Sequence, residues 1–193
     1  MAADPPTDLP IEHFRDAAAF EAWLAAHAGD KGVWLKIAKK DAGATSVRIA
    51  EALEIALCHG WIDGQRLACD ERFYLQRFVP RRPRSLWSKI NVGHAERLIA
   101  AGRMQAGGWR EIEAAKADGR WQAAYEGSAT MQVPAELAAA LAGNRKAKAF
   151  FEALDRTNRY AVCWRVHTAR KPETRAARVE RLVAMLARGE KLH

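Results

Sequence analysis

The sequence predicts an α+β fold that is predominantly helical, with a small antiparallel sheet of about three strands packed on helices and a helical module at the C-terminal end. Three observations support this class. Apolar and polar residues alternate over 33–40, and less regularly over 61–68 and 72–79, as in half-buried strands. Apolar residues recur at helical spacing in most of the remaining chain. The last third is rich in alanine and has no strand pattern.

Two helices are predicted within the first 60 residues. Asp16 is suited to cap a helix that runs to about residue 28, where the turn sequence AGDKG follows. The second helix begins near Ser46 and stops at Gly60, because glycine commonly follows the last helical turn. Each helix has apolar residues mostly on one side, so each is expected to pack against the sheet.

A hairpin is predicted next, with the sequence CDE as the turn between strands 61–68 and 72–79. Pro80 and Pro83 are incompatible with a central strand, so the sequence PRRPR is expected to form an exposed, extended loop. A helix follows, capped by Ser85 or Ser88 and ending near the sequence AAGR. Another helix is expected from about Trp109 to Asp118.

The composition changes near residue 131. We therefore predict an α+β domain at residues 1–130, which carries the sequences GWIDGQ and PRRPRSLWSKIN, and a helical module at residues 131–193. Pro134 is suited to the first turn of the first helix in this module. At 193 residues the chain is long enough for one domain with an appended unit.

The chain is basic, with a formal net charge of +8. Residues 72–89 contain six basic residues and no acidic one, and residues 134–193 contain thirteen basic and six acidic residues. This distribution favours anionic partners such as phosphate-bearing molecules or nucleic acid. It says little about the fold.

Cysteine spacing and hydropathy argue against several classes of protein. The three cysteines form no CxxC pair, so we expect reduced thiols and neither a disulfide framework nor a zinc site. The histidines show no paired spacing, and we expect no metal and no cofactor. The apolar runs are too short for a membrane span and the first residues do not resemble a secretory signal, so a cytoplasmic protein is expected.

Several motifs resemble one bacterial family. The stretches EALEIALCHGWIDGQ, PRRPRSLWSKIN, LIAAGRMQAGGWREIEAAKADGRW and RKPETRAARVERLVAMLARGEK are similar to the YdeI/OmpD-associated family, also called the bacteriocin-protection or OmdA-type family. The resemblance spans most of the chain. It implies a link to tolerance of antimicrobial peptides or to an outer-membrane porin, but it implies no reaction.

The candidate site is an anion pocket around the arginine-rich loop. Arginines there can make bidentate contacts with phosphate or carboxylate, and a helix that begins nearby would offer free backbone N–H groups. Hydroxyl and amide side chains would add neutral donors, and tryptophans could stack on a base, at about 1–3 kcal/mol per stack. The predicted ligand-binding residues are Trp61, Arg81, Arg82, Arg84, Ser85, Trp87, Ser88, Asn91 and Trp121.

A structural interpretation of the same residues is equally open. Tryptophans are commonly core residues, Ser88 and Asn91 can be local caps, and Asp63 can pair with a nearby arginine. An enzymatic alternative uses Asp63 as the general base on a phosphorylated or carboxylated metabolite, with His59 or Ser88 assisting it. A third alternative is an interaction protein that meets an envelope or porin-related partner, which only the family resemblance suggests.

Overall fold

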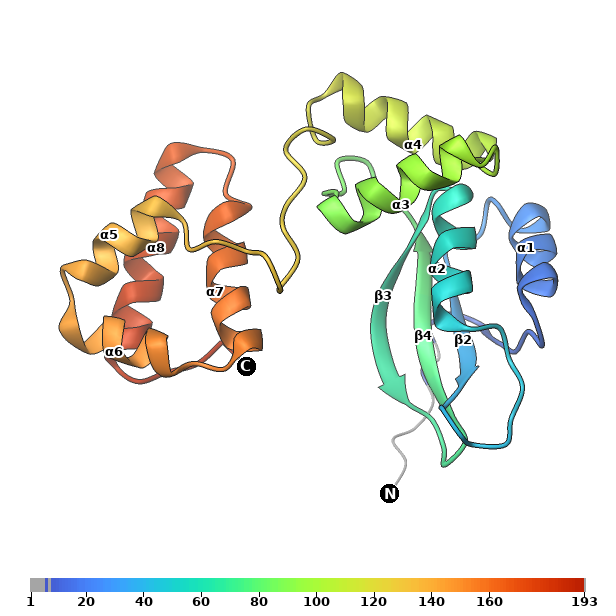
Figure 1. The fold of residues 1–193 in the computed structure, drawn as a ribbon, viewed down its shortest axis with the longest axis horizontal. Coiled ribbons are helices and arrows are strands. Elements are labelled where there is room, and N and C mark those ends of the chain that lie inside the picture. The colour runs from blue at the N-terminus through green and yellow to red at the C-terminus, as the bar shows by residue number, and fades with distance from the viewer. Residues whose placement is uncertain (1–5, 7, 193) are drawn as a thin grey trace. The chain divides into compact units, whose positions relative to one another are not determined.

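The computed structural model describes residues 6 and 8–192, and it divides into two compact units (Figure 1). The N-terminal unit comprises the described residues up to 87 together with 91–123. The C-terminal unit comprises residues 124–192 together with 88–90. The predicted α+β class is confirmed.

The sheet of the N-terminal unit has four strands in the order β1-β2-β4-β3. Three of them were predicted: β2 (Val33–Ala38), β3 (Trp61–Ala68) and β4 (Phe73–Pro80), in which β4 pairs antiparallel with both neighbours. The fourth, β1 (Ile11–Glu12), pairs in parallel with β2. The sheet is therefore mixed rather than purely antiparallel, and β1 was missed because two residues are too few to show an alternating pattern.

Two helices cover one face of this sheet, α1 (Ala17–Ala26) and α2 (Ile49–Cys58) (Figure 1). Asp16 caps α1, as predicted, by accepting a hydrogen bond of 2.9 Å from the N–H of Ala19. Phe20 and Leu24 from α1 and Ile55 from α2 are buried against the alternate strand residues that face them. This packing forms the main core of the unit.

The turn between β3 and β4 is organised by Asp70. Its carboxylate accepts hydrogen bonds from the backbone N–H groups of Arg72 (2.9 Å) and Phe73 (2.8 Å), and it pairs with Lys36 at 3.1 Å. Although partial desolvation opposes the shift, these donors lower the pKa of Asp70 to about 2. The predicted hairpin thus has a carboxylate-stabilised turn.

Two further helices belong mainly to the N-terminal unit, α3 (Lys89–Ala100) and α4 (Ala106–Ala117). The start of α4 lies against the end of α2, where the N–H of Gln105 donates to the carbonyl of Cys58 at 3.1 Å. Gly107 and Gly108 allow this approach, since a Cβ at either position would lie 2.3 Å from a carbonyl oxygen of residues 58–59.

The C-terminal unit is helical, as predicted, with α5 (Ala135–Ala142), α6 (Arg145–Ala153), α7 (Arg156–His167) and α8 (Pro172–Ala187). Leu137, Phe151, Val166 and Leu186, one from each helix, are among the buried residues of a separate core. Among the described residues, no helix combines the length and the apolar character that crossing a membrane requires.

Candidate functional site

The arginine-rich loop contains a tight turn instead of the extended conformation predicted for it. The carbonyl of Arg82 accepts a hydrogen bond of 3.0 Å from the N–H of Ser85, Pro83 lies at the second position and Arg84 at the third. Arg84 has a φ of 67°, so the arrangement is that of a type II turn. A non-glycine residue in this left-handed region costs about 1 kcal/mol. Below, residues 82–85 are called the arginine turn.

Two buried arginines hold the arginine turn from inside the N-terminal unit. Arg81 is 5% exposed and donates from Nη1 to the carbonyl of Leu86 at 3.2 Å. Arg120 is 6% exposed and donates from Nη1 to the carbonyl of Ser85 at 2.8 Å. Its Nε contacts both carboxylate oxygens of Asp118, at 2.8 and 2.7 Å. Arg81 and Arg120 thus stabilise the loop by donating hydrogen bonds to its backbone carbonyls.

Arg120 and Asp118 were not among the predicted site residues. Both lie in the sequence AKADGRW, which was noted only as part of the family resemblance. The signal that could have identified them is the spacing of an aspartate and an arginine around Gly119, whose φ of 78° reverses the chain. This turn brings the two side chains together.

The three predicted tryptophans have different environments. Trp61 is 2% exposed and lies in the main core, with its ring edge-on to Trp23. Trp87 is also 2% exposed, and the guanidinium of Arg81 lies over its ring at 3.7 Å from the centroid. A base therefore cannot stack on that face of Trp87 while Arg81 is in place.

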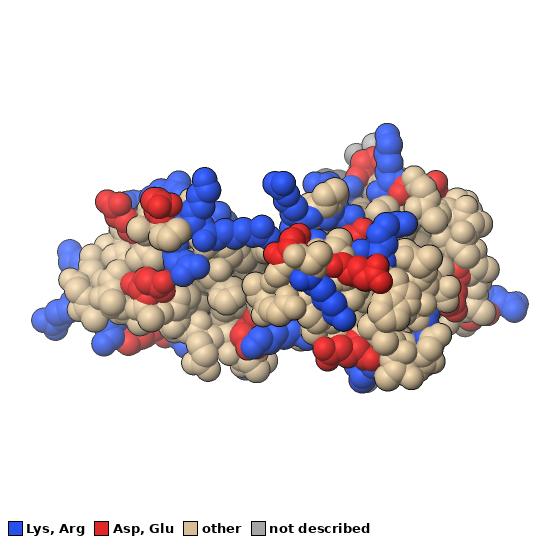
Figure 2. Space-filling view, turned by 90° about the horizontal axis from the view of Figure 1, so that it is seen from above, with Lys and Arg blue, Asp and Glu red and all other residues tan. Residues whose placement is uncertain are grey.

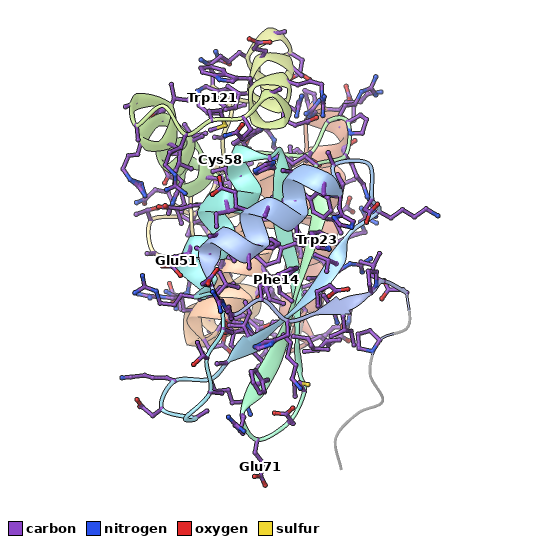
Figure 3. The ribbon with its side chains drawn as sticks, turned by 90° about the vertical axis from the view of Figure 1, so that its right-hand side faces the viewer. Phe14, Trp23, Glu51, Cys58, Glu71 and Trp121 are labelled. Atoms are coloured by element: carbon purple, nitrogen blue, oxygen red, sulfur yellow. The ribbon has the colours of Figure 1, made fainter. Side chains whose placement is uncertain are left out.

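Trp121 is the predicted tryptophan that keeps appreciable exposed surface. Its ring contacts Trp87 with centroids 4.8 Å apart. It follows Arg120, which binds the carbonyl of Ser85, so Trp121 lies near the arginine turn. Figure 3 labels Trp121 close to α4.

Arg82 and Arg84 are exposed, and their side chains make no hydrogen bond or ion pair with any residue in the described part of the chain. Most other arginines of the protein have such contacts, as Arg120 does. Figure 2 shows basic side chains on the surface with acidic ones between them. The structure therefore separates Arg81, which is internal, from the two arginines that can reach a ligand.

The neutral donors of the predicted site are only partly available. Ser85 is half-buried, and both its backbone groups are used to hold the turn. Ser88 is 9% exposed and forms a bridge with Tyr125 within the C-terminal unit. Asn91 is half-buried in the first turn of α3. The first N–H of α3, from Lys89, donates to the carbonyl of Tyr125 at 2.9 Å, so it is not free for an anion.

Asp63, the candidate general base, lies on β3 opposite Phe78. The residue is exposed as a whole, but shielding of its carboxyl group from water raises the pKa, while the charges of Arg81 and Arg66 lower it by less. Arg66 in turn donates to Gln76 at 3.2 Å. The structure thus brings Asp63 near Arg81, but Trp61, which precedes it by two residues, is in the core.

Among residues 8–192, no group of three or more His, Cys, Asp or Glu side chains is placed so that it could hold a metal ion. His59 caps the end of α2 through its backbone. Burial lowers the pKa of His59 and raises the pKa of Cys58 beside it. Burial thus favours the uncharged form of both side chains.

Two family models match the chain. Residues 12–111 match the family described as a domain of unknown function (DUF8412), and residues 130–189 match the family described as bacteriocin-protection, YdeI or OmpD-associated. The second match confirms the resemblance over the C-terminal unit, whereas GWIDGQ and PRRPRSLWSKIN lie in the segment that matches the first family. No curated protein and no solved structure matches the chain.

Proposed function

We propose that this chain, which belongs to the family DUF8412, described as a domain of unknown function, is a cytoplasmic protein that binds a phosphate-bearing polyanion. Because it carries a module of the bacteriocin-protection family at residues 130–189, we propose further that this binding supports tolerance of antimicrobial peptides. Nucleic acid is the partner that fits best. The contact is made by Arg82 and Arg84 of the arginine turn.

The observation that carries this proposal is the contrast between the fixed turn and its free side chains. The chain holds the turn with two buried arginines and accepts a left-handed backbone at Arg84, yet the side chains of Arg82 and Arg84 make no hydrogen bond or ion pair with the described residues. A positioned pair of guanidinium groups is suited to adjacent phosphates. Exposure favours an extended polyanion over an enclosed small molecule.

Two further features support a polyanion. Trp121 is partly exposed near the turn, and a base could stack on its ring if the ammonium group of Lys116, which lies 5.4 Å from the ring centroid, moves aside. Residues 134–193 carry thirteen basic and six acidic residues, so seven of the eight net positive charges lie in this part of the chain. Such a charge increases the rate of association with nucleic acid without requiring specific contacts.

The test is the affinity of a fluorescently labelled single-stranded oligonucleotide, measured by anisotropy at about 0.1 M salt. The double variant Arg82→Ala/Arg84→Ala is expected to bind about ten- to a hundredfold more weakly, because two phosphate contacts are lost. The matched control is Arg145→Ala/Lys146→Ala, which removes two exposed charges at the start of α6 that, like Arg82 and Arg84, have no side-chain hydrogen bond or ion pair with a described residue. Equal losses in the two variants would leave only a general charge effect and would refute the proposed contact.

Tolerance is measured separately. A bacterial strain that expresses the wild-type chain should withstand a higher concentration of a cationic antimicrobial peptide than one that expresses Arg82→Ala/Arg84→Ala at the same level. If the variant protects the strain as well as the wild type does, polyanion binding by these two arginines is not the cause of the tolerance.

A second candidate function is catalysis with Asp63 as the general base, and the raised pKa of its carboxyl group favours it. A folded pKa above the ordinary 3.8 means that the native protein holds this proton more tightly than the unfolded chain does. The stability that this group contributes is therefore lost as the pH rises from 3.8 through the raised pKa.

We accordingly expect Asp63→Asn to increase the melting temperature at neutral pH, and the increase to disappear below pH 3.8, where the carboxyl group is protonated in both states. A phosphorylated or carboxylated metabolite that is turned over by the wild type and only bound by Asp63→Asn would establish the enzymatic function. A lower melting temperature in Asp63→Asn at neutral pH would show instead that the carboxylate is a stabilising partner of Arg81.

A further inference from the structure

The C-terminal unit contains a hollow of about 260 Å³ that is lined by none of the residues of the arginine turn. It lies between the segment 128–133, which precedes α5, and the residues from the end of α6 through the first two turns of α7. At roughly 30 Å³ for each water-sized group, it has room for eight or nine such groups. It is therefore large enough for a small organic molecule.

One part of the hollow is apolar. Met131, Val133 and Leu154 contribute hydrocarbon or thioether surface, and Val133 is an exposed large hydrophobic side chain, with 38% of its surface accessible. Cys163 also contributes to the wall and is 2% exposed. Burial raises the pKa of its thiol, so the group is neutral. This wall favours a hydrocarbon chain.

The other part carries positive charge and hydrogen-bond donors. Arg156 is exposed, and its side chain makes no hydrogen bond or ion pair with any described residue. Arg159 uses Nη2 for the carbonyls of Glu152 and Leu154, at 2.7 and 3.4 Å, which fixes its guanidinium group at the rim. The hydroxyl of Tyr160 is 3.5 Å from the carbonyl of Glu126, which is long for such a bond, so it can turn to a ligand.

The acidic residue that precedes Arg156 does not neutralise this rim. Asp155 caps α7 by accepting hydrogen bonds from the backbone N–H of Asn158 at 2.8 Å and from its side-chain amide at 2.9 Å. These bonds lower the pKa of Asp155, so its carboxylate is held on its own helix. A ligand with an anionic head and an apolar tail matches both parts of the hollow.

We propose that this hollow binds a small amphipathic carboxylate, with an alkyl chain of about six to eight carbons on the apolar wall and the carboxylate at Arg156 and Tyr160. This site lies wholly within the C-terminal unit and is independent of the arginine turn.

Octanoate is the probe, with octan-1-ol as the neutral analogue of the same chain length. In the full-length protein labelled with ¹⁵N and with ¹³C-methyl methionine, octanoate is expected to shift the Met131 methyl and the Tyr160 amide signals with a Kd of about 1 mM, typical of a ligand of this size. Octan-1-ol should bind about five- to tenfold more weakly, because it lacks the charge that Arg156 recognises.

Two variants locate the site. Arg156→Gln is expected to weaken octanoate binding about five- to tenfold and to leave octan-1-ol binding unchanged. Arg145→Gln is the matched control, because Arg145 is also exposed and is the first residue of a capped helix, α6. Val133→Glu is expected to abolish octanoate binding without lowering the melting temperature, since Val133 is exposed and the new carboxylate repels the ligand.

The absence of shifts at Met131 and Tyr160 would overturn the proposal, as would octan-1-ol binding as tightly as octanoate. Equal effects of Arg156→Gln and Arg145→Gln would also overturn it, because they would reflect net charge alone. The variant Arg82→Ala/Arg84→Ala should keep the octanoate shifts, so failure of this proposal and failure of polyanion binding can be distinguished.

Discussion

Gly108→Ala is expected to lower the free energy of unfolding by about 2–3 kcal/mol, the usual cost of forcing extra atoms into a packed contact. A Cβ at this position would lie 2.3 Å from the carbonyl oxygen of Cys58 and 2.3 Å from Sδ of Met104. Met104 can move, but the carbonyl belongs to the last turn of α2 and is fixed by the core. The start of α4 would have to retreat from α2.

Gly93→Ala is the control for this prediction. Gly93 is also inside a helix, α3, but a Cβ there would meet no atom within 4 Å. The substitution should therefore stabilise the protein by about 0.5–1 kcal/mol through helix propensity alone. Urea unfolding of the three proteins gives both values, and a Gly108→Ala protein as stable as Gly93→Ala would contradict the close packing of α2 and α4.

Trp61→Ala is expected to destabilise the protein by about 3–5 kcal/mol, the range for removal of a buried large aromatic side chain. Trp61 is 2% exposed and packs among the core residues between the sheet and the two helices that cover it. The measurement separates the two interpretations that the sequence left open for this residue. A ligand-stacking tryptophan would be needed for binding and cost little stability, whereas a core tryptophan costs much.

Trp109→Ala provides the comparison, because Trp109 is 38% exposed on α4. Its loss should change the unfolding free energy by no more than about 1 kcal/mol, as is typical of surface positions. Similar stabilities of Trp61→Ala and Trp109→Ala would show that Trp61 does not stabilise the core, and would favour the interpretation that it binds a ligand.

The periodicity of the sequence was sufficient to predict most of the elements. Strands β2, β3 and β4 and helices α1 to α4 lie close to the predicted ranges, and residues 135–187 are helical as expected, because the apolar residues of these elements repeat at the spacing of one buried face. Strand β1 could not be predicted in this way. Its two residues depend on pairing with Trp34 and Leu35, which are more than 20 positions away in the chain.

The candidate site was less accessible to sequence reasoning. Arg81 and Arg82 are neighbours in the sequence, yet one is buried against Trp87 and the other is exposed. Nothing local distinguishes them, since the burial of Arg81 depends on where the chain places Trp87 and the carbonyl of Leu86. The turn was missed for a related reason, because its third position holds Arg84 where glycine is usual.

The arginines of α8 also show that the local sequence does not reveal which arginines are used within the protein. Arg175 and Arg178 lie three positions apart, as phosphate-binding residues on one helix face would. In the structure Arg178 donates to the carbonyl of Arg165 at 2.6 Å, and Arg175 donates to the carbonyl of Ala169 at 3.1 Å. Both therefore satisfy backbone groups at and just beyond the end of α7, a use that the spacing alone does not reveal.

Contact between the arginine turn and phosphates is tested most directly by the salt dependence of oligonucleotide binding, compared between the wild type and Arg82→Ala/Arg84→Ala. If these two guanidinium groups contact phosphates, the slope of the logarithm of the binding constant against the logarithm of the salt concentration should become less steep by about 1–2 in the variant. The reason is that binding releases about one counterion fewer for each phosphate contact that is lost. An unchanged slope would mean that Arg82 and Arg84 do not touch the polyanion, and polyanion binding by the arginine turn would be refuted.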